Sequence, residues 1–343
     1  MGDEASSSPN YWQVAAGSIG RDYSDDFLRY GLAFVGEPQI PYIKQVQPGD
    51  RILLKRGLTQ VVAVGVAETR DGTCSGAEDK RWLYDYDGWE LPGYCHVEWH
   101  RGDTPQTATG LTRATIQRVW KPELVNLAES ALVTWASLPR APEPAPTRAV
   151  EDEEIIKTLV GDGLRPGAAE ELTATIRRIR LLAGYHAKFT WNEVNEAEVR
   201  TFLVVPLLLA LGWPEQNIKL ELSAQAAGRI DVACFGRPYR RDEGGHINTE
   251  DCVLIVECKD FRSGLDYAHG QGKGYAREFP AARAVVATNG WCYKVYPREE
   301  NDFSDRPAAY LNLLWPQDRY PRDPDKVAGA LEVVKLLLPH AWR

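Results

Sequence analysis

The chain has 343 residues, 44% of them hydrophobic, which suggests two or three domains with apolar cores of ordinary size. The chain contains 40 Lys and Arg and 48 Asp and Glu, which gives a net charge of −8. It therefore lacks the overall positive charge that is typical of a strong nonspecific nucleic-acid binder. The six cysteines include no CxxC pair, which argues against a zinc knuckle or a disulfide scaffold. The most apolar stretch, 202–211, is too short to span a bilayer. We therefore expect a cytoplasmic protein that has no membrane contact.

The first part of the chain is predicted to be rich in short strands. Residues 1–9 are expected to form a disordered lead-in. The apolar runs that follow are separated by Gly-bearing turns, which predicts a small antiparallel barrel. The expected strands are 11–15, 51–55, 61–67, 82–89 and 96–99; a helix is expected at 114–135, and a short helix or turn at 22–30.

Residues 10–138 resemble the EVE and PUA-like small barrels. The resemblance rests on a Tyr-Trp opening strand, the GDRILL turn and strand at 49–54, the Gly-Val strand after it, and the DGW and VEW triplets. It implies a concave pocket that accepts a flipped, modified base, stacks it on aromatic rings and contacts its edge through polar groups. Core packing is the alternative role for each Trp. The candidate pocket residues are Trp12, Ser18, Tyr23, Trp82, Asp87, Trp89 and Trp99.

Four prolines between positions 139 and 146 predict a stiff linker over 139–150, because proline excludes both helix and central strand. A second domain, 151–343, is expected after it. Asn195 can cap the helix predicted at 195–211, and Pro206 should kink that helix. Residues 151–190 are expected to be helical, with a break at 161–167 and a second helix at 168–184. The other expected helices are 265–279 and 323–338, and the expected strands are 218–222, 229–235, 252–257, 283–288 and 291–296.

Two arginine groups in the second domain are candidate DNA contacts, because guanidinium forks suit phosphate oxygens. For the first group, a solvated helix face is the alternative role. The two groups are Arg177, Arg178 and Arg180 in a helix, and Arg237, Arg240 and Arg241 in the long loop 236–251.

Isolated charges interrupt two apolar strands of this domain. Asp231 follows Ile230, and Glu257 and Lys259 flank Cys258 at the end of the next strand. Burial of such charges without partners is costly, so a bound divalent cation is the simplest reason for them. Asp231, Glu257 and the carbonyl of Cys258 would be the ligands of Mg²⁺ or Mn²⁺. Lys259 lies on the same strand face as Glu257 and could orient or deprotonate the attacking water, or stabilise the charge on phosphorus.

The same region resembles the PD-(D/E)xK nuclease superfamily, in the form found at the N-terminus of type I restriction-enzyme motor subunits. The matching pieces, in order, are NEAEVR at 195–200 with Pro206 and LGW at 211–213, GRID at 228–231, VECK at 256–259, Gln271 with Tyr275, and TNG at 288–290. The resemblance implies a mixed sheet flanked by helices, with Asp231 and Glu257 as metal ligands and Lys259 as a catalytic residue. It also implies roles for Gln271 and for Glu196 as a helix-borne acid, with Glu198 as the rival of Glu196.

The predicted architecture is therefore a PUA/EVE-like β-barrel domain followed by an α/β (α+β) restriction-endonuclease-like domain. We expect a Mg²⁺- or Mn²⁺-dependent DNA endonuclease, in particular a modification-dependent restriction enzyme that acts on foreign double-stranded DNA. Two alternatives stay open: a nuclease for unmodified DNA, DNA ends or RNA, and an inactive nucleic-acid sensor on a nuclease-like scaffold. One active site cuts one strand, so a homodimer is expected for double-strand cleavage. The chain contains no GxxxxGK[ST] sequence, and we expect no ATP-driven step.

Overall fold

The chain forms two compact units, residues 1–18 with 22–143 and residues 19–21 with 144–343. The computed structural model describes residues 8–18, 20–78, 83, 85–188, 194–224, 228–241, 249–300 and 302–342. The division falls inside the predicted Pro-rich linker, and both ends of that linker are hydrogen-bonded. The Ala141 amide donates to the Arg29 carbonyl in the first unit, and the Val150 amide donates to the Pro316 carbonyl in the second.

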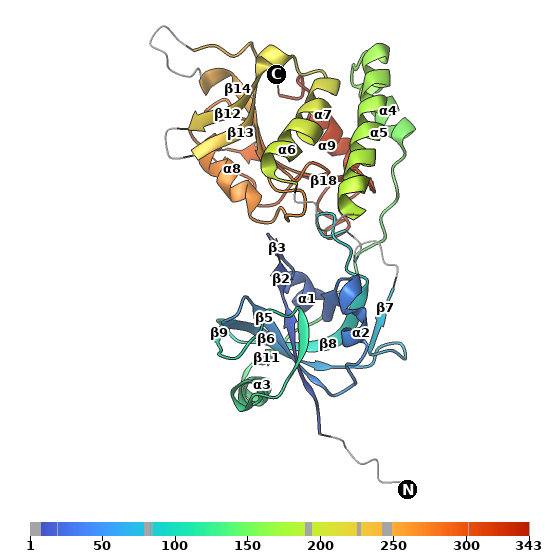
Figure 1. Ribbon diagram of the computed structural model, residues 1–343, viewed down its shortest axis with the longest axis vertical. Helices are drawn as coiled ribbons and strands as arrows, with labels where there is room; N and C mark the ends of the chain where they lie inside the picture. Colours follow the sequence, from blue (N-terminus) through green and yellow to red (C-terminus); the bar gives the residue numbers. More distant parts are fainter. Residues whose placement is uncertain are drawn as a thin grey trace. The chain divides into compact units, whose positions relative to one another are not determined.

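Most of the first unit is one mixed sheet with short helices around it (Figure 1). Its helices are α1 (Ser24–Tyr30), α2 (Ile40–Ile43) and α3 (Pro122–Thr134). Its strands are β1 (Tyr11–Ala15), β4 (Leu32–Val35), β5 (Arg51–Arg56), β6 (Gln60–Ala67), β7 (Ser75–Ala77), β8 (Gly93–Arg101), β9 (Gln106–Thr107), β10 (Ile116–Val119) and β11 (Ala136–Ser137). The chain also contains a separate pair of two-residue strands, β2 (Gly17–Ser18) and β3 (Arg21–Asp22).

The pairing corrects the expectation that this sheet is antiparallel throughout. The main path is β10-β1-β5-β6-β8-β11, and β8 also pairs with β4 and β7. Strands β1 and β5 run parallel, whereas the neighbouring pairs β1–β10 and β5–β6 are antiparallel. The first unit is therefore a branched, mixed sheet.

Two predicted elements of the first unit were wrong. Within the predicted strand 82–89, Asp87 and Gly88 have φ angles of 52° and 84°, and Tyr86 forms a β-bridge with Trp89. Residues 86–89 are therefore a tight turn. The predicted helix 114–135 starts only at Pro122, and the residues before it form β10. Proline is tolerated in the first turn of a helix but not in its interior, which is why the helix starts there.

The second unit is a mixed sheet with helices on both faces. Its helices are α4 (Asp152–Gly161), α5 (Pro166–Lys188), α6 (Glu196–Val199), α7 (Val205–Ala210), α8 (Ala268–Ala276) and α9 (Ala330–Leu336). Its strands are β12 (Ile218–Ala224), β13 (Gly228–Phe235), β14 (Cys252–Cys258), β15 (Ala284–Thr288), β16 (Cys292–Glu299), β17 (Asp302–Phe303) and β18 (Ala309–Asn312). The sheet order is β12-β13-β14-β15-β16-β17, with β18 also on β16, and only β14 and β15 among these pairs run parallel.

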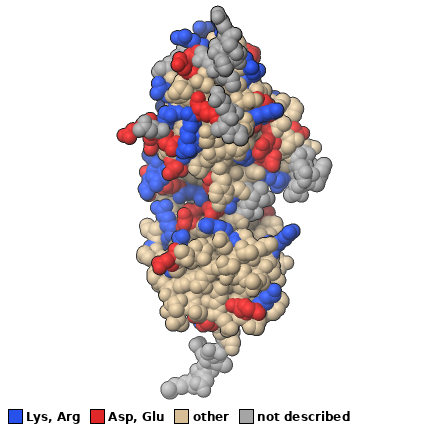
Figure 2. All heavy atoms as spheres, turned by 90° about the vertical axis from the view of Figure 1, so that its left-hand side faces the viewer, with Lys and Arg blue, Asp and Glu red and all other residues tan. Residues whose placement is uncertain are grey.

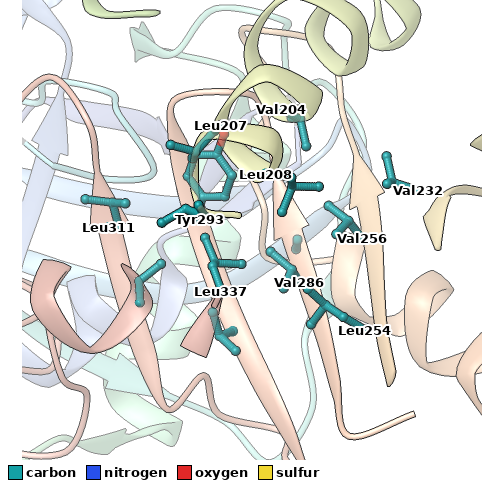
Figure 3. Close-up of a cluster of buried hydrophobic side chains, with 14 of the residues drawn as sticks. Val204, Leu207, Leu208, Val232, Leu254, Val256, Val286, Tyr293, Leu311 and Leu337 are labelled. Carbon is teal, nitrogen blue, oxygen red and sulfur yellow. The ribbon is translucent and has the colours of Figure 1, made fainter. Parts of the chain in front are cut away.

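Side-chain alternation gives this sheet two different faces. One face contributes apolar side chains such as Leu254, Val256 and Val286, which pack against Leu207 of α7 and Leu337 (Figure 3). Ile255, Glu257 and Val285 alternate with those residues and face α8. Buried β-branched and aliphatic runs on β14 and β15 suit strands covered on both sides. The polar residues Asp231 and Glu257 therefore lie at one end of a sheet that is otherwise apolar.

The helix predicted at 195–211 forms, with an internal π-helical turn at Arg200–Val204 between α6 and α7. Asn195 caps it as predicted: its side chain accepts from the Glu198 amide, and the Glu198 carboxylate accepts from the Asn195 amide. Pro206 cannot donate a backbone hydrogen bond. Arg178 Nη2 lies 3.4 Å from the carbonyl of Phe202, the acceptor that residue 206 would use in an α-helix.

Helix α8 packs tightly on the sheet through Gly272. A Cβ added there would lie 2.6 Å from Val285 Cγ1, whereas one added at Gly274 would meet nothing within 4 Å. We expect Gly272→Ala to lower the free energy of unfolding by about 1–3 kcal/mol, because the helix must move away from the sheet. Gly274→Ala should instead stabilise the protein by up to about 1 kcal/mol through helix propensity. Urea denaturation of both variants tests this, and equal effects would contradict the close packing.

Candidate active site

Asp231 and Glu257 lie where β13 and β14 stop pairing. The last paired residues at this end are Val232 and Val256, and Asp231 and Glu257 come next along the two strands. Asp231 Oδ2 accepts a hydrogen bond from the Cys258 amide at 2.8 Å, so its side chain holds the strand ends together. Asp231 Oδ1 accepts from Arg200 Nη1 at 3.0 Å. The structure thus brings the two predicted metal ligands to one end of the sheet.

A chain of hydrogen bonds runs from Glu257 to α8. Lys259 Nζ donates to Glu257 Oε1 at 2.7 Å and to Gln271 Oε1 at 3.0 Å. Gln271 Nε2 in turn lies 3.0 Å from the Tyr275 hydroxyl. Gln271 is on α8, so the helix that packs closely on the sheet at Gly272 also positions Lys259. The predicted group of Glu257, Lys259 and Gln271 is therefore in direct contact.

Burial sets the charges of this group. Glu257 is 1% exposed, and desolvation raises its pKa to about 7, although Lys259 opposes the shift. Burial likewise raises the pKa of Asp231, against the Cys258 amide and Arg200. For Lys259, burial alone would lower the pKa, but the hydrogen bond and charge of Glu257 outweigh it and the net shift is upward. Lys259 is therefore cationic at neutral pH.

The structure separates the two rival helix acids. Glu196 Oε1 lies 3.6 Å from Lys259 Nζ, and burial raises the pKa of Glu196 while Lys259 lowers it. Glu198 is engaged in the capping box with Asn195 instead. Glu196 is the helix-borne acid next to the site.

The donor set suits a hard divalent cation. Glu257 Oε2 is buried and has no hydrogen-bond partner among the described residues, an arrangement that a cation would relieve. Burial raises the pKa of the Cys258 thiol, so its carbonyl oxygen is the atom of Cys258 suited to Mg²⁺. The described part of the chain contains no group of three or more His, Cys, Asp or Glu side chains arranged to hold a metal. Two carboxylates and a carbonyl fit Mg²⁺, which keeps several waters.

The aromatic residues predicted to bind a base are mostly core residues, which corrects that expectation. Trp12 and Trp99 are each 1% exposed, and their indole N–H groups donate to Asp50 Oδ2 and to the Leu32 carbonyl. Tyr23 and Asp87 are also buried. The rings of Trp12, Tyr23 and Trp99 therefore have no open face on which a base could stack, and the Asp87 side chain is closed off as well. Trp89 is half-buried, whereas Trp82 and the Ser18 side chain lie outside the described residues.

The structure gives one of the arginines predicted to contact DNA a different role. Arg180 is committed to Asp152 Oδ1 and to the Leu313 carbonyl, which makes it structural. Arg177 and Arg178 are exposed on α5. Arg237, Arg240 and Arg241 follow the far end of β13, which lies about 13 Å of strand beyond Asp231, so they are remote from the candidate site. Positive and negative side chains are interspersed on the face of the second unit seen in Figure 2.

Two residues of the site were not predicted. Arg200 is buried and contacts both Asp231 and Glu221. A signal for Arg200 was present, because it follows Val199 and precedes Leu203 on the apolar side of the helix. Glu221 gave no signal, since it belongs to an ordinary alternating strand.

No protein-family model matches the chain, and no curated protein sequence matches it. Within the described ranges, every helix is too short or too polar to cross a membrane. The geometry of the site therefore carries the functional argument.

Proposed function

We propose that this protein is a Mg²⁺- or Mn²⁺-dependent DNA endonuclease whose second unit hydrolyses phosphodiester bonds. The observation that carries the proposal is the state of Glu257: one oxygen is held by Lys259, and the other is buried without a partner in the described part of the chain. Asp231 lies beside it at the end of the neighbouring strand. Two acids and a lysine arranged in this way suit phosphodiester hydrolysis.

Each side chain has a distinct task in the proposal. Asp231 and Glu257 would hold the metal, which when bound supplies an acidified water and neutralises charge on the phosphate. Lys259 carries its proton at neutral pH, because its pKa is raised. It therefore donates hydrogen bonds to the oxygens on which charge develops, a role that fits better than that of general base. Gln271 fixes the position of the Lys259 ammonium.

We further propose that the first unit recognises the DNA, with a modified base as its target. A cavity of about 410 Å³ in this unit has Trp99 in its wall, together with Glu68, Glu98 and Ser137. Its volume is within the range of small-molecule sites. Because Trp99 is buried, recognition would rest on the polar wall, whose carboxylates and hydroxyl can contact a base edge.

The test is a cleavage assay on supercoiled plasmids that carry cytosine, 5-methylcytosine or 5-hydroxymethylcytosine. We expect cleavage with Mg²⁺ or Mn²⁺, none with EDTA, and at least a hundredfold loss in Asp231→Asn. Preference for one modified plasmid supports the recognition proposal, and equal cleavage of all three contradicts it. Linear product under single-turnover conditions would indicate paired active sites. RNA cleavage alone, or no cleavage by folded protein with either metal, would overturn the DNA endonuclease proposal.

A further inference from the structure

Arg200 joins two acids from neighbouring strands. It is 8% exposed, at the start of the π-helical turn. Its Nη1 lies 3.0 Å from Asp231 Oδ1 and 2.5 Å from Glu221 Oε1, and its buried Nε has no partner among the residues that the structure describes. Such a buried guanidinium is costly unless the carboxylates compensate it, so its position depends on both acids.

Glu221 is in a strained conformation that brings it to Arg200. It lies on β12 between the paired residues Leu220 and Leu222, opposite Asp231, yet has a φ of 52°. Left-handed backbone at a residue other than glycine costs about 1–3 kcal/mol and persists only where the surroundings impose it. Among the described residues, Glu221 forms ion pairs with the buried Arg200 guanidinium and, at 3.6 Å, with the exposed Arg229. The strain therefore serves the contact with Arg200.

Each oxygen of the Asp231 carboxylate already accepts one hydrogen bond in this arrangement and keeps a second lone pair. Oδ2 accepts from the Cys258 amide, and Oδ1 accepts from Arg200. A divalent cation at Asp231 must therefore share the carboxylate with the Arg200 guanidinium or displace it. If both bind the same carboxylate, the two positive charges repel each other strongly, because the site is partly buried. Glu221 offers the same guanidinium nitrogen, Nη1, a second carboxylate from the neighbouring strand.

We propose that Arg200 and Glu221 are positioning residues that set the divalent-metal affinity of Asp231. Arg200 holds the carboxylate in place before metal binds and competes with the metal for it. Glu221 retains the guanidinium when the metal takes Asp231. This inference rests on the proposed function, because it assumes that Asp231 is a metal ligand.

The two residues should change metal affinity in opposite directions. In Arg200→Met, which keeps much of the side-chain volume, Mn²⁺ should bind about tenfold more tightly, because a competing charge is gone. In Glu221→Gln, Arg200 has only Asp231 as a full counter-charge, and Mn²⁺ should bind about tenfold more weakly. Arg229→Gln is the matched control: it removes a neighbouring charge that is 3.6 Å from Glu221 and 69% exposed, and affinity should stay within twofold.

The measurement is isothermal titration calorimetry of the full chain with Mn²⁺, without DNA. Arg200→Lys, which keeps the charge, should retain near-wild-type affinity and covers the case in which Arg200→Met does not fold. Shifts of the same sign in Arg200→Met and Glu221→Gln, or no shift in Glu221→Gln, would overturn the inference, as would wild-type protein that binds no Mn²⁺. Tighter Mn²⁺ binding in Arg200→Met and weaker binding in Glu221→Gln, in a protein that cleaves no nucleic acid, would uphold the inference and reject the proposed function.

Discussion

Replacing Lys259 with methionine is expected to lower the rate of DNA cleavage by two to three orders of magnitude, while Mn²⁺ still binds. The ammonium carries its charge at neutral pH because Glu257 raises its pKa against the effect of burial. It lies at the surface end of the site, in contact with Gln271, where a phosphate oxygen can reach it. Removal of one fixed donor to developing charge typically costs about 10²–10³ in rate. Single-turnover cleavage with saturating metal measures the loss.

The matched control is Lys335→Met, which removes a lysine of the same unit that pairs with Asp162, the residue directly after α4. It should cleave at the wild-type rate. Should Lys259→Met keep full activity, Lys259 would be only the counter-ion of Glu257. A loss of Mn²⁺ binding equal to the loss of rate would likewise place Lys259 in the structural support of the site.

The second large effect concerns stability, and it needs no substrate. In EDTA, the free energy of unfolding should fall as pH rises from about 4.5 to about 7, with Glu257 contributing about 3 kcal/mol of that fall. The unfolded chain loses the Glu257 proton near pH 4.5, whereas burial keeps it on the folded protein up to about pH 7. The stabilisation is therefore complete below pH 4.5 and is lost above pH 7. Urea denaturation at several pH values measures it.

Glu257→Gln should remove this dependence, because the amide stays neutral at every pH. The variant should therefore gain stability relative to wild type as pH rises, and be the more stable protein at pH 8 in EDTA. Glu170→Gln, an exposed change on α5, should follow the wild-type curve. A constant difference between Glu257→Gln and wild type from pH 4.5 to 8 would show that Glu257 titrates normally.

The sequence predicted the core of the second unit well, for physical reasons. Short apolar runs such as Leu254–Val256 are typical of buried strands. An acid within such a run, such as Glu257, is therefore a candidate for a functional role. Asn195 and Glu198 have the spacing of a capping box, so the start of α6 was also predictable. Asp231, Glu257 and Lys259 therefore came together as expected.

Other features depend on contacts that local patterns do not contain. The alternating segment 82–89 contains a turn, because Asp87 adopts a positive φ, which few residue types favour. Trp12 and Trp99 could equally have been core or pocket residues, and only the partners of their indole nitrogens decide for the core. Arg200 and Glu221 meet through tertiary structure, and the strained backbone of Glu221 has no sequence signature.

The side chains of the candidate site come from the helix that begins at Glu196, from β12, from β13, from β14 with Lys259 directly after it, and from α8, all within the second unit. The boundary between residues 143 and 144 thus leaves the whole candidate site on one side. For the proposed nuclease, this division means that the second unit could be joined to a different recognition unit without changes to the site. Target choice and cleavage chemistry would then be able to evolve separately.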